Sequence, residues 1–386
     1  MKYLLVSLLL LLGLAIPAQA ETSTVTAEYQ LINLLNRHRR SMGQPTLQLD
    51  SPASVVARSH SQEMLKTNFF ALESPQRGSL EYQLAYARVS GRSLHTFIAL
   101  DYEIPNIFQQ LKRNPALLSD EVTHVAVGIV SGQHPKYGRA LWATVILIQV
   151  MAELENVPRT AQPGEILKLQ ASLAPGYHNP RLPVTVPYGR VLTFYPVRRQ
   201  GDKVWFEVPL RQGKGRYTLE LLLDRPGQGP RVATILPLYV GVGYPLKDPD
   251  STGSPSPAFA NTDEAAQHLF QRVNQARVKH GLRALEPDPL LTYVAWNHSA
   301  DMARRRFFAH INPDGEDPNG RYHRAGGRGF VGENIASDQS VESAHLRLMS
   351  SPGHRANILH ESFTHLGIGV YFDANSYYIT QLFLQK

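Results

Sequence analysis

The chain has 386 residues, of which 43% are hydrophobic and 18% charged, and it contains no cysteine. This composition is typical of globular proteins, predicts two or three domains that each hold their own core, and excludes a disulfide framework and thiol chemistry. The net charge of +7 serves either solubility alone or contact with anionic cell-surface material, whereas the basic runs are too short and too poor in aromatic residues to predict nucleic-acid binding.

The N-terminus predicts a cleavable secretory signal peptide over residues 1–20. Lys2 precedes an apolar run from Tyr3 to Ile16, and Ala18-Gln19-Ala20 supplies a small-residue cleavage site. No later stretch approaches about 18 uninterrupted apolar residues, so no membrane span is expected. Glu21 stands where a lipoprotein would carry cysteine. We therefore expect a secreted or periplasmic mature protein, with a net charge of +6 because Lys2 is lost.

The mature chain begins with helical patterns over residues 21–152, where leucines recur at helical spacing and a second helix is predicted from about Pro52 to Thr67. Over residues 153–245, prolines and glycines separate short runs of strand-forming residues. The predicted strands are Ile166–Leu173, Arg190–Tyr195, Lys203–Val208, Tyr217–Leu223 and Val232–Val240. We expect an immunoglobulin-like sandwich there, acting as a spacer or an adhesive unit. Residues 246–261, rich in Pro, Ser and Gly, form a linker.

Three polar side chains stand at breaks in the apolar pattern after the linker. His310 ends a helical run, and Glu333 follows a glycine, as expected of a tight turn. His354 falls in the first turn of a short helix that Ser351 caps and Pro352 begins, so the positive helix end keeps its ring neutral. Two imidazoles and a carboxylate that converge form either a metal or acid/base site, or a hydrogen-bond network that ties loops together.

Many short motifs follow one another across residues 262–386. They are Asn274-Gln275-Ala276-Arg277, His298-Ser299-Ala300-Asp301-Met302-Ala303, Phe307-Phe308-Ala309-His310, Pro313-Asp314-Gly315, Gly332-Glu333-Asn334-Ile335-Ala336, Ser351-Pro352-Gly353-His354-Arg355-Ala356-Asn357-Ile358-Leu359, Gly367-Ile368-Gly369-Val370 and Tyr378-Ile379-Thr380-Gln381. In this order they resemble the CAP superfamily of cysteine-rich secretory, antigen 5 and pathogenesis-related proteins, in its bacterial SCP-like branch. The resemblance implies an α-β-α sandwich whose cleft holds His310, Glu333 and His354.

The first module repeats this pattern at a constant offset of 238 residues, so that His60-Ser61 falls on His298-Ser299. The three site residues are replaced in it. Leu72 stands for His310, Thr96 for Glu333, and Ala116-Leu117 for Gly353-His354. We therefore predict an α+β chain with two CAP-like α-β-α sandwich modules flanking the immunoglobulin-like sandwich, the first a degenerate copy. Histidines kept in both copies are interpreted as structural, namely His60, His124, His298 and His365.

The resemblance implies a site without an agreed chemistry. His310, Glu333 and His354 are the candidate catalytic residues and the candidate ligands of a divalent cation such as zinc, and Glu342 is the nearest second glutamate. The residues expected to line the cleft are Asn334, Tyr378 and Gln381. We expect it to bind a small apolar or cell-envelope-derived ligand, because no nucleophile beside a base is visible. The alternative is a metal-assisted extracellular hydrolase, peptidase-like, that uses the same cleft.

Overall fold

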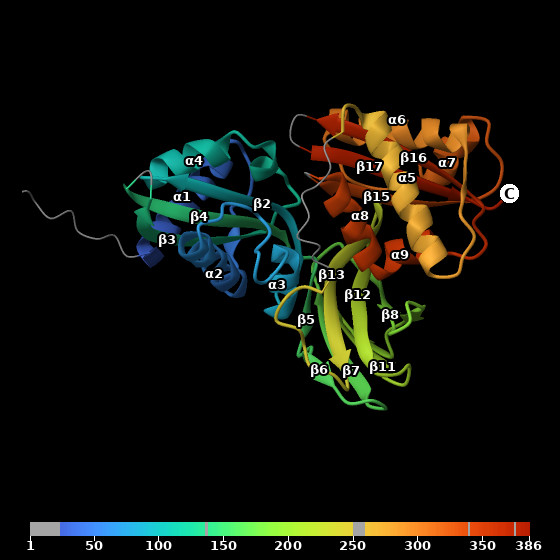
Figure 1. The fold of residues 1–386 in the computed structure, drawn as a ribbon, viewed down its shortest axis with the longest axis horizontal. Helices are drawn as coiled ribbons and strands as arrows, with labels where there is room; N and C mark the ends of the chain where they lie inside the picture. The colour runs from blue at the N-terminus through green and yellow to red at the C-terminus, as the bar shows by residue number, and fades with distance from the viewer. Residues whose placement is uncertain (1–23, 136–137, 250–258, 339, 374–375) are drawn as a thin grey trace, which may run out of the picture.

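The computed structural model describes residues 24–135, 138–249, 259–338, 340–373 and 376–386. The predicted signal peptide and most of the predicted linker lie outside these residues. The described part of the chain is a mixed α+β protein with four sheets. Figure 1 shows one unit of helices and strands at the left, a second at the right, and a unit of strands below and between them.

The first α/β unit is a four-stranded sheet with helices packed against it, in the strand order β1-β3-β4-β2. Its helices are α1 (Thr24–Ser41), α2 (Ser51–Thr67), α3 (Leu80–Tyr86), α4 (Ile104–Lys112) and the 3-10 helix η1 (Pro115–Leu118). Its strands are β1 (Gln48–Leu49), β2 (Arg92–Asp101), β3 (His124–His134) and β4 (Gly138–Gln149). Helix α2 begins where Asp50 accepts a hydrogen bond from Ala53 N–H, and it ends at Asn68 in the left-handed conformation.

The last α/β unit has the corresponding strand order, β14-β16-β17-β15. Its helices are α5 (Thr262–Lys279), α6 (Pro289–Arg305), α7 (Pro318–Arg324), α8 (Val341–Ser350) and α9 (Pro352–Ile358). Its strands are β14 (Glu286–Pro287), β15 (Val331–Asp338), β16 (His365–Asp373) and β17 (Ser376–Leu384). Helix α6 is capped by Asp288 and ends at Arg306 in the left-handed conformation, as α2 does at the matching positions. In both units the strand at the edge of the sheet, β2 or β15, faces the middle of the molecule (Figure 1).

The two α/β units share long-range hydrogen bonds as well as strand order. The matching pairs are Ser61–Gly128 with Ser299–Gly369, Ser61–Thr144 with Ser299–Thr380, and His60–Ala71 with His298–Ala309. The helix lies so close to the sheet that a Cβ on Gly369 would lie 2.0 Å from the backbone nitrogen of Trp296. His60 and His298 are buried and hydrogen-bonded to a carbonyl, in agreement with their predicted structural role.

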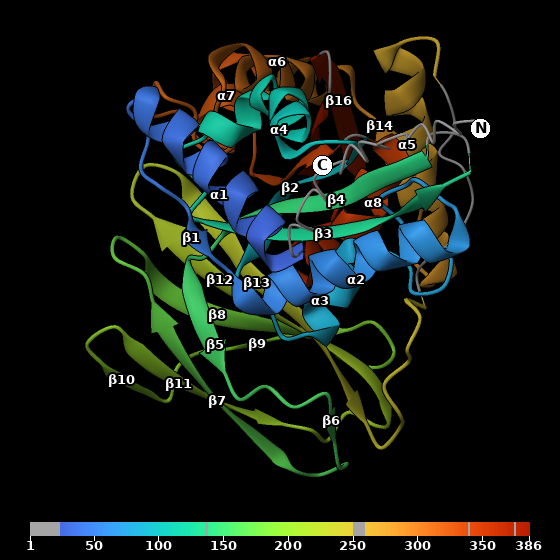
Figure 2. The same ribbon diagram turned by 90° about the vertical axis from the view of Figure 1, so that its left-hand side faces the viewer.

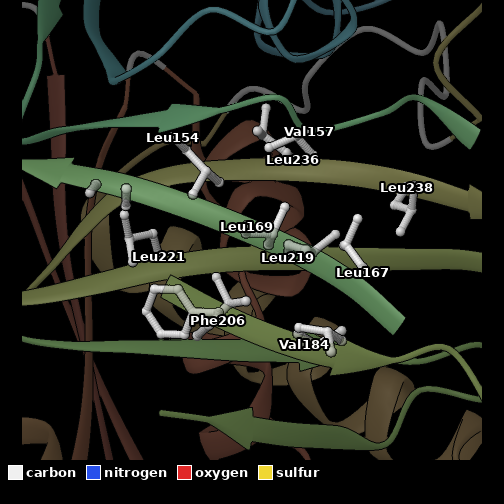
Figure 3. Close-up of a cluster of buried hydrophobic side chains, with 14 of the residues drawn as sticks. Leu154, Val157, Leu167, Leu169, Val184, Phe206, Leu219, Leu221, Leu236 and Leu238 are labelled. Atoms are coloured by element: carbon white, nitrogen blue, oxygen red, sulfur yellow. The ribbon is translucent and has the colours of Figure 1, made fainter. Parts of the chain in front are cut away.

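The middle unit consists of two sheets that share one hydrophobic cluster (Figure 3). The strand orders are β10-β11-β7-β5 and β6-β13-β12-β8-β9. The strands are β5 (Ala152–Glu155), β6 (Thr160–Ala161), β7 (Ile166–Leu173), β8 (His178–Thr185), β9 (Val191–Phe194), β10 (Arg198–Gln200), β11 (Lys203–Pro209), β12 (Gly215–Arg225) and β13 (Gly229–Val240). All five predicted strands are present. The sequence analysis omitted β5, β6, β8 and β10. In β8, Pro180 and Pro183 obscure the strand pattern.

The middle unit packs against both α/β units through β12 and β13. Strand β13 contacts α3 and β2, while β12 and β8 contact α9. Arg231 of β13 pairs with Glu121 of the first unit at 2.7 Å and donates to the carbonyl of Phe308 in the last unit at 3.2 Å. Figure 2, turned by 90°, also shows β12 and β13 beneath the two α/β units. The strand unit therefore packs against the segments next to the candidate site, namely α9 and the loop at Phe308, and its predicted role as a spacer or an adhesive unit stays a prediction.

None of the described helices is long and apolar enough to cross a membrane.

Candidate functional site

The predicted helix cap at His354 is confirmed by the structure. Ser351 precedes α9, its Oγ accepts a hydrogen bond from the backbone N–H of His354, and Pro352 occupies the first turn. The prediction for Glu333 is wrong in its local structure, because this residue lies within strand β15 and pairs in register with Leu382. A Cβ on Gly332 would lie 2.8 Å from the ring of Phe363, so close packing, not a turn, accounts for the glycine.

Glu333 forms a buried hydrogen-bonded group with His310 and Arg321. Its Oε1 lies 2.9 Å from Nδ1 of His310, and its Oε2 accepts from Nη2 of Arg321 at 2.6 Å. Arg321 also donates to the carbonyl of His310 at 2.8 Å. Burial alone would raise the pKa of the Glu333 carboxyl, but the guanidinium of Arg321 and the bond from His310 hold it below its usual value. The Glu333 carboxylate is thus ionised, and it forms an ion pair with the guanidinium of Arg321.

His354 belongs to a different hydrogen-bonded group. Its Nδ1 lies 2.7 Å from Oγ of Ser351, and that hydroxyl donates to Oε2 of Glu220 in the middle unit. Glu220 also accepts from the backbone N–H of Gly353 at 3.0 Å. Burial, followed by the charge of His310, lowers the pKa of His354 to about 3. The His354 imidazole is therefore neutral at physiological pH, as predicted. Burial is the main reason for this neutrality, whereas the prediction rested on the positive end of the helix.

The predicted metal set does not fit a metal ion as the side chains are arranged. Among the described residues, no three His, Asp or Glu side chains lie together in a way that could hold one. Both carboxylate oxygens of Glu333 are engaged, and the guanidinium of Arg321 stands against this carboxylate. Glu342, the nearest candidate for a second glutamate, pairs with Arg272 at 2.6 Å and with His268 at 2.9 Å. We therefore derive no chemical step through a metal ion.

The predicted cleft residues are largely enclosed. Asn334 and Gln381 are fully buried, and Asn334 Nδ2 donates to Gln381 Oε1 and to the carbonyl of His354, each at 3.1 Å. Tyr378 lies in β17, opposite Ser337, and none of the three lines the cavity beside His354. Asn334, which also contacts Gln381, therefore holds α9 against β15.

The first unit lacks these groups. Thr96 pairs in register with Ile146 as Glu333 pairs with Leu382, which places Thr96 at the matching position. As predicted, Asn114 caps η1 before Pro115 in the way that Ser351 caps α9 before Pro352, so Ala116 and Leu117 follow the cap where Gly353 and His354 do. Arg39 donates to the carbonyl of Leu117 in the way that Arg277 donates to that of Ile358. The 3-10 helix η1 has four residues where α9 has seven, so Leu117 also takes the place of Ile358 at the end of the helix, and η1 contains no histidine.

A cavity of about 260 Å³ lies where the three units meet. The last unit contributes His354 and Ile335, the first contributes Arg92 and the middle one Val232. Glu333 has only 2% of its side chain exposed, and His310 has 18%. Among the described residues, this cavity reaches the candidate site at His354, and it lies at the junction of the three units. Sequence analysis could not find it, because Arg92 and Val232 are distant in sequence and belong to no shared motif.

Sequence analysis also missed Arg321 and Glu220. Arg321 stands on α7, and its only local signal is the capped Asp317-Pro318 start of that helix. Glu220 alternates with the leucines of β12, a pattern typical of a residue that faces solvent. Its burial comes from a second unit on that face, which alternation within one strand cannot reveal.

Two proteins of Bacillus subtilis match part of this chain in sequence. The chain is 32% identical over 139 residues to the uncharacterized protein YkwD of Bacillus subtilis, covering 36% of this chain and 53% of YkwD. It is 34% identical over 123 residues to the uncharacterized membrane protein YlbC of the same organism, covering 31% and 34% of the two chains. The matches thus span about half and a third of these relatives' own lengths.

An extracellular protein containing a SCP domain from Bacillus anthracis is a solved structure similar to this chain. The identity is 22%, the match covers 57% of this chain and 78% of that one, and the TM-score is 0.31. The model of the cysteine-rich secretory protein family matches residues 32–150 and 270–383, which is more than half of the chain. The two matched regions fall on the two α/β units, and the chain belongs to the cysteine-rich secretory protein (CAP) family.

Proposed function

We propose that this chain is an exported CAP-family protein that binds a small ligand with an apolar body and an acidic group, in the cavity between its three units. It would carry a signal peptide at residues 1–20 and two CAP modules with α-β-α architecture, at residues 21–152 and 262–386. A linker at 246–261 and an immunoglobulin-like sandwich at 153–245 would join the modules. The cell envelope is a source of such ligands outside the cytoplasm. The observation that carries the proposal is an unpaired arginine, Arg92, on the cavity wall.

Arg92 has no ion-pair partner among the described residues. Its guanidinium carbon lies 5.9 Å from the ring centre of Phe308, and the carboxylates of Glu121 and Glu220 act on it without forming a salt bridge. Burial, followed by the like charges of Arg347 and Arg231, lowers its pKa to about 10, so it stays charged at neutral pH. By contrast, Arg347 on the same wall pairs with Asp338 at 3.2 Å. A cation that is partly desolvated and forms no salt bridge favours a ligand with a carboxylate or a similar anion.

The rest of the cavity favours an apolar ligand body. Its wall includes aliphatic side chains from all three units, namely Leu84, Val89, Val232, Ile235, Ile335 and Leu348. Charged side chains also line the cavity, among them Glu73, Glu81 and Asp338, so an apolar ligand body would lie against the aliphatic part of the wall. His354 supplies a second polar group, a neutral imidazole. Turnover has less support, because the metal set is not assembled and the Ser351 hydroxyl, 2% exposed as a residue, is held between two partners.

Octanoate and 1-octanol test the proposal, because they share an apolar chain and differ in charge. Calorimetry on the full mature chain should show that octanoate binds at least about tenfold more tightly than octanol, which corresponds to about 1.4 kcal/mol. Arg92→Met should remove this preference and leave octanol binding unchanged. Arg40→Met, at an exposed arginine of α1, is the matched control. Equal binding of the two probes, or an octanoate affinity that Arg92→Met does not change, would refute the proposal.

A further inference from the structure

Glu220 and His354 compete for a single proton. The Oγ of Ser351 lies between them, in contact with the Glu220 carboxylate on one side and 2.7 Å from Nδ1 of His354 on the other. A serine hydroxyl has one proton to donate and two lone pairs to accept with. If this proton is donated to Glu220, Nδ1 of His354 must carry its own proton to complete the second bond. The hydrogen-bond partners of Ser351 therefore determine which ring nitrogen of His354 is protonated.

The contact reaches across two units and is closely fitted. Glu220 comes from β12 of the middle unit, and Leu219 and Leu221 on either side of it belong to that unit's core, so Glu220 points from the opposite face toward α9. A Cβ on Gly353 would lie 2.7 Å from Oε1 of Glu220. The carboxylate thus needs glycine at this position in order to reach Ser351.

Burying a carboxylate costs free energy of desolvation, so a residue that only joined two units would be expected to be apolar. Glu220 is fully buried, and an apolar side chain would pack there without loss of hydration. The first unit shows that the fold does not require the group, because its shorter helix η1 presents Ala116 and Leu117 and has no histidine in this region. The hydrogen bonds that link Glu220, Ser351 and His354 are thus found with the α/β unit that has a histidine after its helix cap.

We propose that Glu220 is a positioning residue that acts through Ser351 to hold the neutral His354 ring in the Nδ1–H form. Nε2 is then a bare nitrogen, and it makes no hydrogen bond to any described residue. Since His354 lines the cavity, Nε2 is able to accept a hydrogen bond from a ligand that carries a donor such as a hydroxyl or an amide. The inference rests on the proposed function only for the place at which a ligand meets His354. The middle unit thus contributes one residue, Glu220, to the candidate site of the last α/β unit.

Glu220→Gln separates this role from packing. Glutamine keeps an oxygen for the N–H of Gly353 and places an amide N–H against Ser351 Oγ. The serine proton is then free to be donated to Nδ1 of His354, and the ring changes to the Nε2–H form. Glu207→Gln is the matched control, because Glu207 is an exposed glutamate on β11 of the same unit.

Long-range proton–nitrogen correlation spectra of the full mature chain at about pH 8.5 provide the measurement, since protonated and bare ring nitrogens give separate nitrogen shifts. Signals of His354 are identified by their loss in His354→Gln. We expect Nδ1–H in the wild type and in Glu207→Gln, and Nε2–H in Glu220→Gln. With Ser351→Ala the ring should no longer respond to Glu220→Gln.

An Nε2–H ring in the wild-type protein overturns the proposal without any variant, as does an unchanged ring in folded Glu220→Gln. Octanoate binding is measured on the same samples. Expected ring forms without octanoate binding would remove the proposed function and leave the role of Glu220 intact. Octanoate binding with an Nε2–H wild-type ring would do the reverse.

Discussion

Glu220→Gln also tests whether the ionised Glu220 carboxylate, buried between β12 and α9, lowers the stability of the folded protein. Burial raises the pKa of the Glu220 carboxyl to about 7, although the bonds from Ser351 and from Gly353 N–H favour the ionised form. Glutamine has nearly the same shape and keeps an acceptor for Gly353, so the substitution removes the charge with little change in packing. The change in stability should therefore depend on pH.

The direction and size follow from proton binding. The folded protein binds the Glu220 proton more tightly than the unfolded chain, in which the pKa is near 4.5. Below that pH both states are protonated and the contribution to stability is complete. It is lost as the pH rises from 4.5 to about 7. The full difference corresponds to about 3 kcal/mol. Relative to the wild type, Glu220→Gln should therefore gain about 2–3 kcal/mol between about pH 5 and pH 8.5.

Urea unfolding followed by near-ultraviolet circular dichroism measures this gain at the two pH values. Because the wild type and the variant share every other titrating group, the difference between them isolates Glu220. Glu207→Gln, at an exposed position, should show no comparable pH dependence. A gap between wild type and Glu220→Gln that is constant from pH 5 to 8.5, or that changes in favour of the wild type, would refute the reasoning.

Three further predictions concern the last unit. Arg277→Met should lower the free energy of unfolding by about 3 kcal/mol in urea titrations, because Arg277 is 1% exposed and donates to four backbone carbonyls; an effect below about 1 kcal/mol would contradict this. Gly369→Ala should lose the native near-ultraviolet signal, since its Cβ would lie 2.0 Å from a backbone nitrogen, whereas Gly315→Ala, in open space at φ +84°, should cost only about 1 kcal/mol. Zinc binding stays a prediction. It would require zinc to replace Arg321 at Glu333, so Arg321→Met should raise the calorimetric zinc affinity at least about tenfold over the wild type, and equal affinities would contradict this reasoning.

Local features of the site could be predicted where neighbouring residues determine them. The cap at Ser351 and Pro352 needs only four adjacent residues, and the structure has it. The strand over Ile166–Leu173 follows from alternation alone and matches β7 at both ends. The turn expected at Glu333 failed for a related reason. A glycine signals either a turn or a close contact, and only the ring of Phe363 beside Gly332 shows which one applies.

The sequence by itself determined the two helix-and-strand modules, the strand unit between them and the loss of His310 and Glu333 from the first copy, because these follow from periodicity, caps and the comparison of one copy with the other. Only the tertiary structure decided what surrounds the site. Glu220 meets Ser351 across 131 residues of chain, and Arg321 meets Glu333 from another helix. In a strand sequence, only the polarity of the side chains indicates whether a face is packed against another unit or exposed to solvent. A carboxylate buried against a second unit therefore has the same pattern as one in water, and the packing of the units determines which it is.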